Sequence, residues 1–195
     1  MARMKESVND RKPVATTLGL ALLALVDKTP QSGYDLCQIF ETTPMSHYSS
    51  SPGAIYPALK RLEREGLARG RNERMGSLRP RRVYRSTEAG HRALVGWVSQ
   101  PLDQSDVLWR LDEVMLRFAF MGGLVDDSTT LRFLDSLATL LELRIAGLEE
   151  FLATMPAEPP HGRLGLTSGI AQFRGLVRWA HEAIELFNDR LERER

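Results

Sequence analysis

The chain has 195 residues, of which 43% are hydrophobic and 26% are charged, and its net charge is +1. This composition supports a packed core in one large domain or two small ones. The longest apolar run, Leu18–Val26, is far shorter than the roughly 20 residues that cross a bilayer. The single cysteine, Cys37, excludes an intrachain disulfide. We therefore predict a cytoplasmic protein with no membrane partner.

The charges are unevenly distributed along the chain. Through Gln100 there are 16 Lys and Arg against 9 Asp and Glu, whereas from Pro101 onward there are 10 against 16. A basic first half suits contact with a polyanion, and an acidic second half does not. The distribution therefore predicts that only the first half binds nucleic acid.

Polar residues open the chain, and apolar spacing then predicts two helices. Residues 1–13 lack an apolar core and are interpreted as a flexible arm, with its basic side chains either in solvent or near phosphates. Apolar residues at steps of three and four predict a first helix over Ala15–Lys28, which Thr29–Pro30 ends. Ser32 is the expected N-cap of a second helix. Polar residues 42–51 form the turn that follows.

The third predicted helix starts near Gly53–Ala54 and stops at Gly66. One of its faces is apolar and packs inward, whereas the opposite face is small or polar. Pro57 is then expected in or next to the first turn, where the missing N–H of a proline costs least. The inward face consists of Ile55, Leu59 and Leu62.

A hairpin rich in arginine and a fourth helix follow. Seven arginines against one acid lie between Arg69 and Arg85. Such a ribbon suits contact with a nucleic-acid backbone, although a solvated hairpin has the same composition. The predicted elements are strands over Leu67–Asn72 and Arg82–Thr87, a loop at Glu73–Arg81, and a helix over Glu88–Ser99 that Thr87 caps.

Two motifs in this region resemble the PadR family of transcriptional regulators. The resemblance is close over residues 15–100, and beyond them it extends only to the helical character of the chain. It implies a winged helix-turn-helix fold that binds a double-stranded DNA operator, a homodimer formed by the carboxy-terminal helices and, in many members, a small aromatic effector. Ser86 stands where the family usually has leucine, which predicts looser packing of the second strand. The motif residues are Tyr56, Pro57, Leu59, Leu62, Glu63 and Gly66, and then Tyr84, Thr87 and Gly90.

The amino-terminal part of the third helix is the expected base-reading element, as in other helix-turn-helix modules. Small residues there allow close approach to the groove, and Lys60 can reach guanine or phosphate. The Tyr56 hydroxyl can bond a phosphate. The alternatives are a free surface lysine and a half-buried packing aromatic. The predicted DNA-binding residues are Ser51, Gly53, Ala54, Tyr56, Pro57, Lys60, Arg64, Arg79, Arg81 and Arg82.

The chain is expected to form a DNA-binding domain at 14–100 and a wholly helical dimerisation domain at 101–195. Apolar residues of the last helix recur at steps of three and four, which favours a seam between two copies, or packing within one chain. The predicted elements are a helix over Val107–Met121, a helix opened by Asp127 or Ser128, a loop at Met155–Gly165, and the last helix. The predicted dimerisation residues are Phe173, Val177, Ala180, Ile184 and Phe187.

Four aromatic residues are candidates for lining an effector pocket, because aromatic walls bind flat ligands well. Ordinary core packing is the alternative for each. The candidates are Trp97, Trp109, Phe118 and Trp179. The four histidines show no metal-ligand spacing and no catalytic motif occurs, so we predict no metal, no cofactor and no enzyme.

The sequence as a whole predicts a mainly helical transcriptional regulator. We expect a ligand-responsive repressor that binds a pseudo-palindromic operator as a homodimer. Two alternatives remain open on the same scaffold: a small-molecule-binding protein, or an adaptor that recruits a protein partner, each with little DNA specificity.

Overall fold

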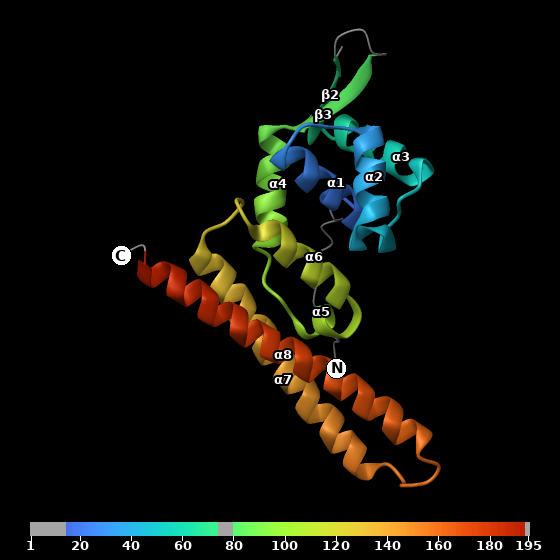
Figure 1. Ribbon diagram of the computed structural model, residues 1–195, viewed down its shortest axis with the longest axis vertical. Coiled ribbons are helices and arrows are strands. Elements are labelled where there is room, and N and C mark those ends of the chain that lie inside the picture. Colours follow the sequence, from blue (N-terminus) through green and yellow to red (C-terminus); the bar gives the residue numbers. More distant parts are fainter. Residues whose placement is uncertain (1–14, 74–79, 194–195) are drawn as a thin grey trace, which may run out of the picture. The chain divides into compact units, whose positions relative to one another are not determined.

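The computed structural model describes residues 15–73 and 80–193 and divides into two compact units, Met1–Leu94 and Val95–Arg195 (Figure 1). The boundary falls inside helix α4, Glu88–Val98. The arm predicted at residues 1–13 lies outside the described residues. Within the parts of the chain that are described, no helix is long and apolar enough to span a membrane.

Helix α1, Thr17–Lys28, packs against α3 and β3 in the core of the first unit. Its leucines Leu22 and Leu23 are fully buried. The hydroxyl oxygen of Thr16 accepts a hydrogen bond from the Gly19 N–H at 3.2 Å, so Thr16 is the N-cap and the helix begins two residues later than predicted. The predicted end at Lys28 is confirmed.

Helix α2, Gly33–Thr42, begins at the predicted N-cap. The Ser32 side chain accepts from the Asp35 N–H, and the Asp35 carboxylate accepts from the Ser32 N–H at 3.0 Å. This reciprocal capping box satisfies two N–H groups that have no partner inside the helix. A short 3₁₀ helix, Pro44–His47, lies within the predicted turn.

Helix α3, Pro52–Arg64, begins slightly earlier than predicted. Proline is favoured at the first helical position, because the N–H that it lacks has no helical partner there. Pro57 consequently lies in the second turn, next to the first. The predicted inward face is confirmed, since its three apolar side chains are at most 1% exposed: Ile55, Leu59 and Leu62.

A Schellman motif ends α3. The N–H groups of Gly66 and Leu67 donate to the carbonyl oxygens of Glu63 and Leu62 at 3.0 and 2.9 Å. Gly66 has a φ of 71°, a left-handed conformation that glycine adopts without steric cost. The predicted helix stop at Gly66 is confirmed.

The wing is part of a three-stranded antiparallel sheet with the order β1-β3-β2. Strands β2 and β3 agree with the predicted pair to within one residue at each end, but the prediction of a two-stranded wing omits β1. Ser32, the N-cap of α2, has an extended backbone and pairs with Val83 of β3, which explains the third strand. The strands are β1, Gln31–Ser32, β2, Ala68–Glu73, and β3, Arg81–Ser86.

The second unit begins with a helical segment that is broken where one helix was predicted. Asp103 caps α5 through a capping box with Asp106, and α5 ends before Arg110, whose φ of −137° and ψ of 29° are not helical. The prediction of a continuous helix over Val107–Met121 is therefore wrong. The two helices are α5, Gln104–Trp109, and α6, Leu111–Met121.

Helices α7, Asp127–Thr154, and α8, His161–Arg193, lie side by side (Figure 1). The predicted start of α7 is confirmed, with Asp126 as its N-cap. Helix α8 starts four residues before the predicted loop ends at Gly165. Pro160 precedes the helix, and its carbonyl oxygen accepts a hydrogen bond from the Leu164 N–H at 2.9 Å. The chain is mainly helical, with a winged helix-turn-helix unit followed by a helical unit.

Candidate functional site

The outer face of α3 presents most of the helix residues that were predicted to bind DNA. Ser51, Gly53 and Tyr56 are exposed at its amino-terminal end, whereas Ala54 is half-buried. Pro57, Lys60 and Arg64 are also exposed. The apolar stripe on the opposite side holds α3 to the core, so these side chains lie on the solvent face of a firmly packed helix. Their contact with DNA stays a prediction.

A glycine at the start of α2 positions Tyr56. A Cβ built on Gly33 lies 2.5 Å from Tyr56 Cε1 and 2.9 Å from Tyr56 Cζ. Any side chain at position 33 would therefore displace the ring. The tyrosine is 41% exposed, with one side of its ring against backbone and its remainder in solvent. Tyr56 was predicted from its motif, but its contact with Gly33 is visible only in the structure.

Arginines of the wing divide between its two faces. Residues that pair directly across β2 and β3 share a face, so the register of Arg69 with Arg85 and of Arg71 with Val83 places these four together. They line a hollow of about 470 Å³ with Ser86, Thr87 and Glu88. Among the residues that the structure describes, no ion pair involves Arg69 or Arg71. Neither was selected from the sequence.

The arginines that were selected near the wing tip have partners within the first unit. Arg82 forms an ion pair of 2.7 Å with Glu63 of α3. The Arg81 guanidinium lies 3.8 Å from the Asp35 carboxylate and 5.7 Å from the centre of the Tyr34 ring. Arg79 lies outside the described residues. Phosphate contact by Arg81 and Arg82 stays a prediction, to be weighed against these internal partners.

The second motif forms the joint between the wing and α4. The Thr87 hydroxyl donates to the carbonyl oxygen of Gly66 at 2.6 Å, and its oxygen accepts from the Gly90 N–H at 3.1 Å. A Cβ on Gly90 would lie only 2.1 Å from the Leu67 carbonyl oxygen. Tyr84, the third motif residue, is 3% exposed. This motif therefore builds the scaffold behind the outer face of α3.

The sequence model of the Transcriptional regulator PadR-like family matches residues 22–95, the segment that contains α3, the wing and this joint. Through this segment the chain is similar to PadR-like transcriptional regulators. The two motifs thus have the structural roles just described.

Curated proteins similar to this chain include transcriptional regulators. The Negative transcriptional regulator PadR of Bacillus subtilis is 27% identical over 88% of this chain and 97% of its own length. Transcriptional regulator YqjI of Escherichia coli is 26% identical over 66% of this chain and 56% of its own length. A crystal structure of B. subtilis PadR in complex with operator DNA has a TM-score of 0.42 and 23% identity, covering 88% of this chain and 99% of that chain.

A serine replaces the leucine that PadR-like proteins usually have at the end of the second wing strand. Its hydroxyl donates to the carboxylate of Asp27 on α1. The Nδ1 atom of His91 lies 3.1 Å from the same carboxylate. At Ser86 a hydrogen bond to α1 is thus present where leucine would make an apolar contact, and looser packing of the strand stays a prediction.

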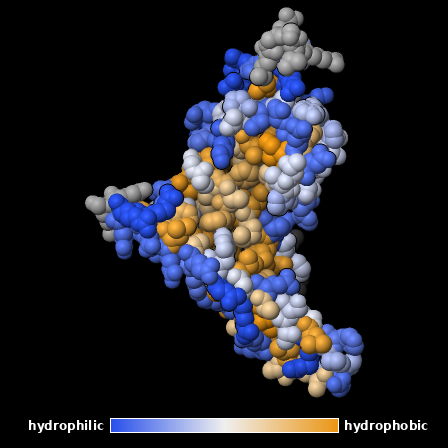
Figure 2. All heavy atoms as spheres, in the orientation of Figure 1, coloured by the Kyte–Doolittle hydropathy of each residue, from blue (hydrophilic) through white to orange (hydrophobic). Residues whose placement is uncertain are grey.

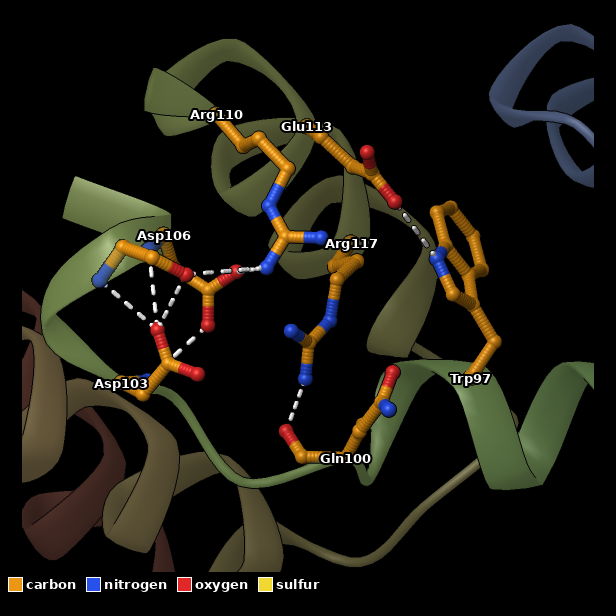
Figure 3. Close-up of polar contacts among 8 residues, drawn as sticks. Trp97, Gln100, Asp103, Asp106, Arg110, Glu113 and Arg117 are labelled. Atoms are coloured by element: carbon orange, nitrogen blue, oxygen red, sulfur yellow. Dashed lines mark hydrogen bonds and ion pairs between the residues drawn. The ribbon is translucent and has the colours of Figure 1, made fainter. Parts of the chain in front are cut away.

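The candidate effector residues of the second unit fall into three environments. Phe118 and Trp179 meet edge to face, with ring centres 5.0 Å apart. Trp97 is 8% exposed, and its Nε1 atom donates to Glu113 at 3.4 Å (Figure 3). Trp109 is 80% exposed. Only Phe118 and Trp179 are thus in contact with each other, and effector binding stays a prediction.

A polar cluster ties the segment after α4 to α6 (Figure 3). Arg117 is 4% exposed, and its guanidinium donates to the Gln100 carbonyl oxygen. Burial lowers the pKa of Arg117. Arg110, at the break between α5 and α6, pairs with Asp106 at 2.7 Å, so the ion pair accompanies the break. Within residues 15–73 and 80–193, no group of three His, Cys, Asp or Glu residues is placed to hold a metal ion.

The predicted dimerisation stripe is partly covered within the chain. Ala180 is fully buried, and Phe173, Val177, Ile184 and Phe187 are half-buried along α8, which packs on α7. Other apolar side chains of the second unit are more than half exposed. Figure 2 shows apolar surface near the end of the α7–α8 pair where the turn connects the two helices. Sequence reasoning missed these residues, which are Leu143, Phe151, Leu164 and Leu186.

Proposed function

We propose that the chain is a homodimeric repressor that binds a pseudo-palindromic DNA operator and responds to a small aromatic ligand. The observation that carries the proposal is α3, which has a fully buried apolar stripe and an exposed face of small, hydroxyl and basic residues. An arginine-rich wing follows it within the segment that matches the PadR-like family. The proposal that the chain represses rather than activates transcription rests on the name of the B. subtilis relative, a negative transcriptional regulator.

The amino-terminal half of α3 is the part proposed to enter the major groove. Gly53 has no side chain and Ser51 a short one, so the helix backbone can approach base edges closely. Lys60, one to two turns further along the exposed face, can donate to guanine or to phosphate. Tyr56, held by its contact with Gly33, presents its hydroxyl to a phosphate.

Two copies are proposed because one helix-turn-helix half-site is too small for strong specificity, and a two-fold dimer doubles it. The second unit supplies apolar surface for such pairing. Leu143 is 55% exposed and lines a hollow of about 140 Å³ with Leu108 and Leu140. Exposed leucine and phenylalanine side chains of this kind are the surface that a protein partner covers.

The ligand response is proposed to involve the aromatic side chains of the second unit. The centre of the Phe118 ring lies 5.0 Å from that of Trp179 and 6.3 Å from that of Phe133. A flat aromatic ligand that displaces one ring of this set would find the other rings as its walls. Binding should quench tryptophan emission in the wild type, and the quenching should be lost in Trp179→Leu but kept in Trp109→Leu.

Salt-dependent binding to duplex DNA tests the proposal. If about six phosphates are neutralised, the log–log slope of affinity against salt is about −5. Lys60→Ala should lower affinity by an amount that depends on sequence, whereas Arg81→Ala should weaken all duplexes alike. Gel-shift titrations at several salt concentrations give both readouts. A flat salt response, or equal affinity for selected and random duplexes, contradicts the proposal.

The same titration separates the repressor from a competing function. Trp109, exposed at 80%, favours an adaptor that holds a protein partner. An adaptor or a small-molecule-binding protein on this scaffold would bind random and selected DNA equally weakly. Specific, salt-sensitive binding excludes both as the main function.

A further inference from the structure

Strand β2 is an edge of the wing sheet, and one of its N–H groups is covered by α3. The sheet order β1-β3-β2 leaves one side of β2 without a neighbouring strand, so alternate N–H groups on that side need other partners. The N–H of Gly70 donates to Oε1 of Glu63 at 2.8 Å. Glu63 belongs to the last turn of α3. A side chain of the helix thus takes the place of a missing strand.

The same carboxylate oxygen reaches the other wing strand. Arg82 of β3 donates to Glu63 Oε1 at 2.7 Å, through its terminal nitrogen. One oxygen atom therefore joins α3, β2 and β3. Charge-assisted hydrogen bonds of this length are about twice as strong as neutral ones.

Glycine at position 70 is required by this contact. A Cβ there would lie 2.8 Å from Glu63 Oε1 and 2.6 Å from Arg82 Nε. Both distances are shorter than a carbon can approach these atoms, so a side chain at position 70 would push the carboxylate and the guanidinium away. The absence of a side chain is what lets Glu63 lie on the strand.

Electrostatics keep the Glu63 carboxylate charged. Its burial alone would raise the pKa, but the hydrogen bonds from Arg82 and Gly70 and the Arg82 charge lower the pKa of Glu63 below its ordinary value. The side chain is 23% exposed, so the surrounding solvent only partly screens the pair. The contact is therefore present throughout the neutral range.

We propose that Glu63 is a positioning residue, which sets the direction of the wing relative to α3 so that both meet one DNA duplex. Most wing residues beyond the core are exposed, and Tyr84 is the only wing side chain among the described ones that is buried beyond Ala68. The Glu63 contact, which joins α3 to both strands, therefore helps to fix their direction. Arg82 then acts as part of this contact rather than on phosphate. The inference rests on the proposed DNA-binding function.

Hydrogen exchange in the free protein tests the contact without any DNA. Glu63→Ala should speed exchange of the Gly70 amide by about tenfold, because its N–H loses its acceptor. Arg82→Gln changes a half-exposed side chain and should speed the same exchange by a smaller factor of about three. Glu65→Ala, two residues away and exposed, is the matched control and should leave exchange unchanged. Wild-type exchange at Gly70 in Glu63→Ala overturns the proposal.

DNA affinity tests the use of the contact. The probe is a duplex selected by the wild-type protein from a random pool. Glu63→Ala and Arg82→Gln should each weaken binding by about tenfold, and the double variant should be no weaker than the single ones, because both act through one contact. The log–log salt slope should stay at the wild-type value in both.

The salt slope also decides whether Arg82 acts with Glu63 to position the wing or contacts a phosphate. If Arg82→Gln lowers the slope by about 0.9 while Glu63→Ala binds normally, Arg82 contacts a phosphate and the proposal is wrong. Arg71→Gln removes the same charge from the other face of the wing and controls for charge alone. If the wild type binds no duplex, the proposed function fails, while Gly70 exchange still decides whether the contact exists.

Discussion

The two units of this chain are stabilised in different ways. The first consists of short elements that are joined by close backbone approaches at glycines and by side chains that bond to backbone, such as Thr87 to Gly66. The second is built on two long helices whose apolar side chains remain partly exposed. The first therefore completes its own core and offers a polar, basic surface. The second retains apolar surface, which suits a protein partner rather than a polyanion.

The largest expected effect tests the close approaches of the first unit. Gly90→Ala places a Cβ 2.1 Å from the Leu67 carbonyl oxygen, which forces α4 away from the wing. We expect a loss of about 3 kcal/mol or more in the free energy of unfolding, measured by urea titration. Gly96→Ala in the same helix meets nothing within 4 Å and should gain up to about 1 kcal/mol. Equal effects of the two would show that the approach at Gly90 is unimportant.

The next effect tests the apolar surface of the second unit. Leu143→Glu places a charge on an exposed position of α7, so the fold should persist while a dimer that covers it dissociates. We expect the dimer dissociation constant to rise by about 100-fold or more, measured by sedimentation. Leu186→Glu on α8 makes the same change on the other helix and locates the interface. If both variants sediment as the wild type does, neither position is in a dimer interface.

A smaller effect tests the joint between the wing and α4. Thr87→Val keeps the shape of the side chain but removes its hydrogen bonds to Gly66 and Gly90. We expect a loss of about 1–2 kcal/mol in the free energy of unfolding. Thr139→Val removes an exposed hydroxyl that bonds only within its own helix, and its loss should be under about 0.5 kcal/mol. Thermal or urea unfolding that ranks them the other way contradicts the assignment.

The smallest effect on stability tests whether the basic surface depends on exact placement. Gly33→Ala should displace the Tyr56 ring, whose nearest atom, Cε1, lies 2.5 Å from the added Cβ. Because the ring is partly exposed and can move, stability should change little, while DNA affinity falls by about tenfold. Gly19→Ala, where the added Cβ has ordinary contacts of 3.4 Å, should leave affinity unchanged. Wild-type affinity in Gly33→Ala means that Tyr56 placement does not matter for binding.

Much of the helical fold was predictable because it depends on local spacing. Apolar residues at steps of three and four indicated α1, α3 and α7, and single residues marked ends such as Ser32 and Gly66. The break at Arg110 was not predictable in this way, since apolar residues continue across it. There the pairing of Arg110 with Asp106, which spacing does not reveal, accompanies the break.

The candidate site was predictable as a surface but not as a set of contacts. The spacing of Ile55, Leu59 and Leu62 settled which side of α3 faces solvent. The arginine count of the wing could not separate Arg82, which pairs with Glu63, from Arg69 and Arg71, which have no ion pair within the described chain. A charge count carries no information about which face of a strand each side chain occupies or what lies opposite.

The sequence by itself determined the family motifs, the inward face of α3 and the basic character of the wing, because each follows from residue types a few positions apart. Only the tertiary structure decided the third strand, the ring contact at Gly33 and the meeting of Glu63, Gly70 and Arg82. A two-residue strand has no periodicity to detect. Partners such as Glu63 and Arg82, 19 residues apart, become neighbours only when the helix and both strands have packed.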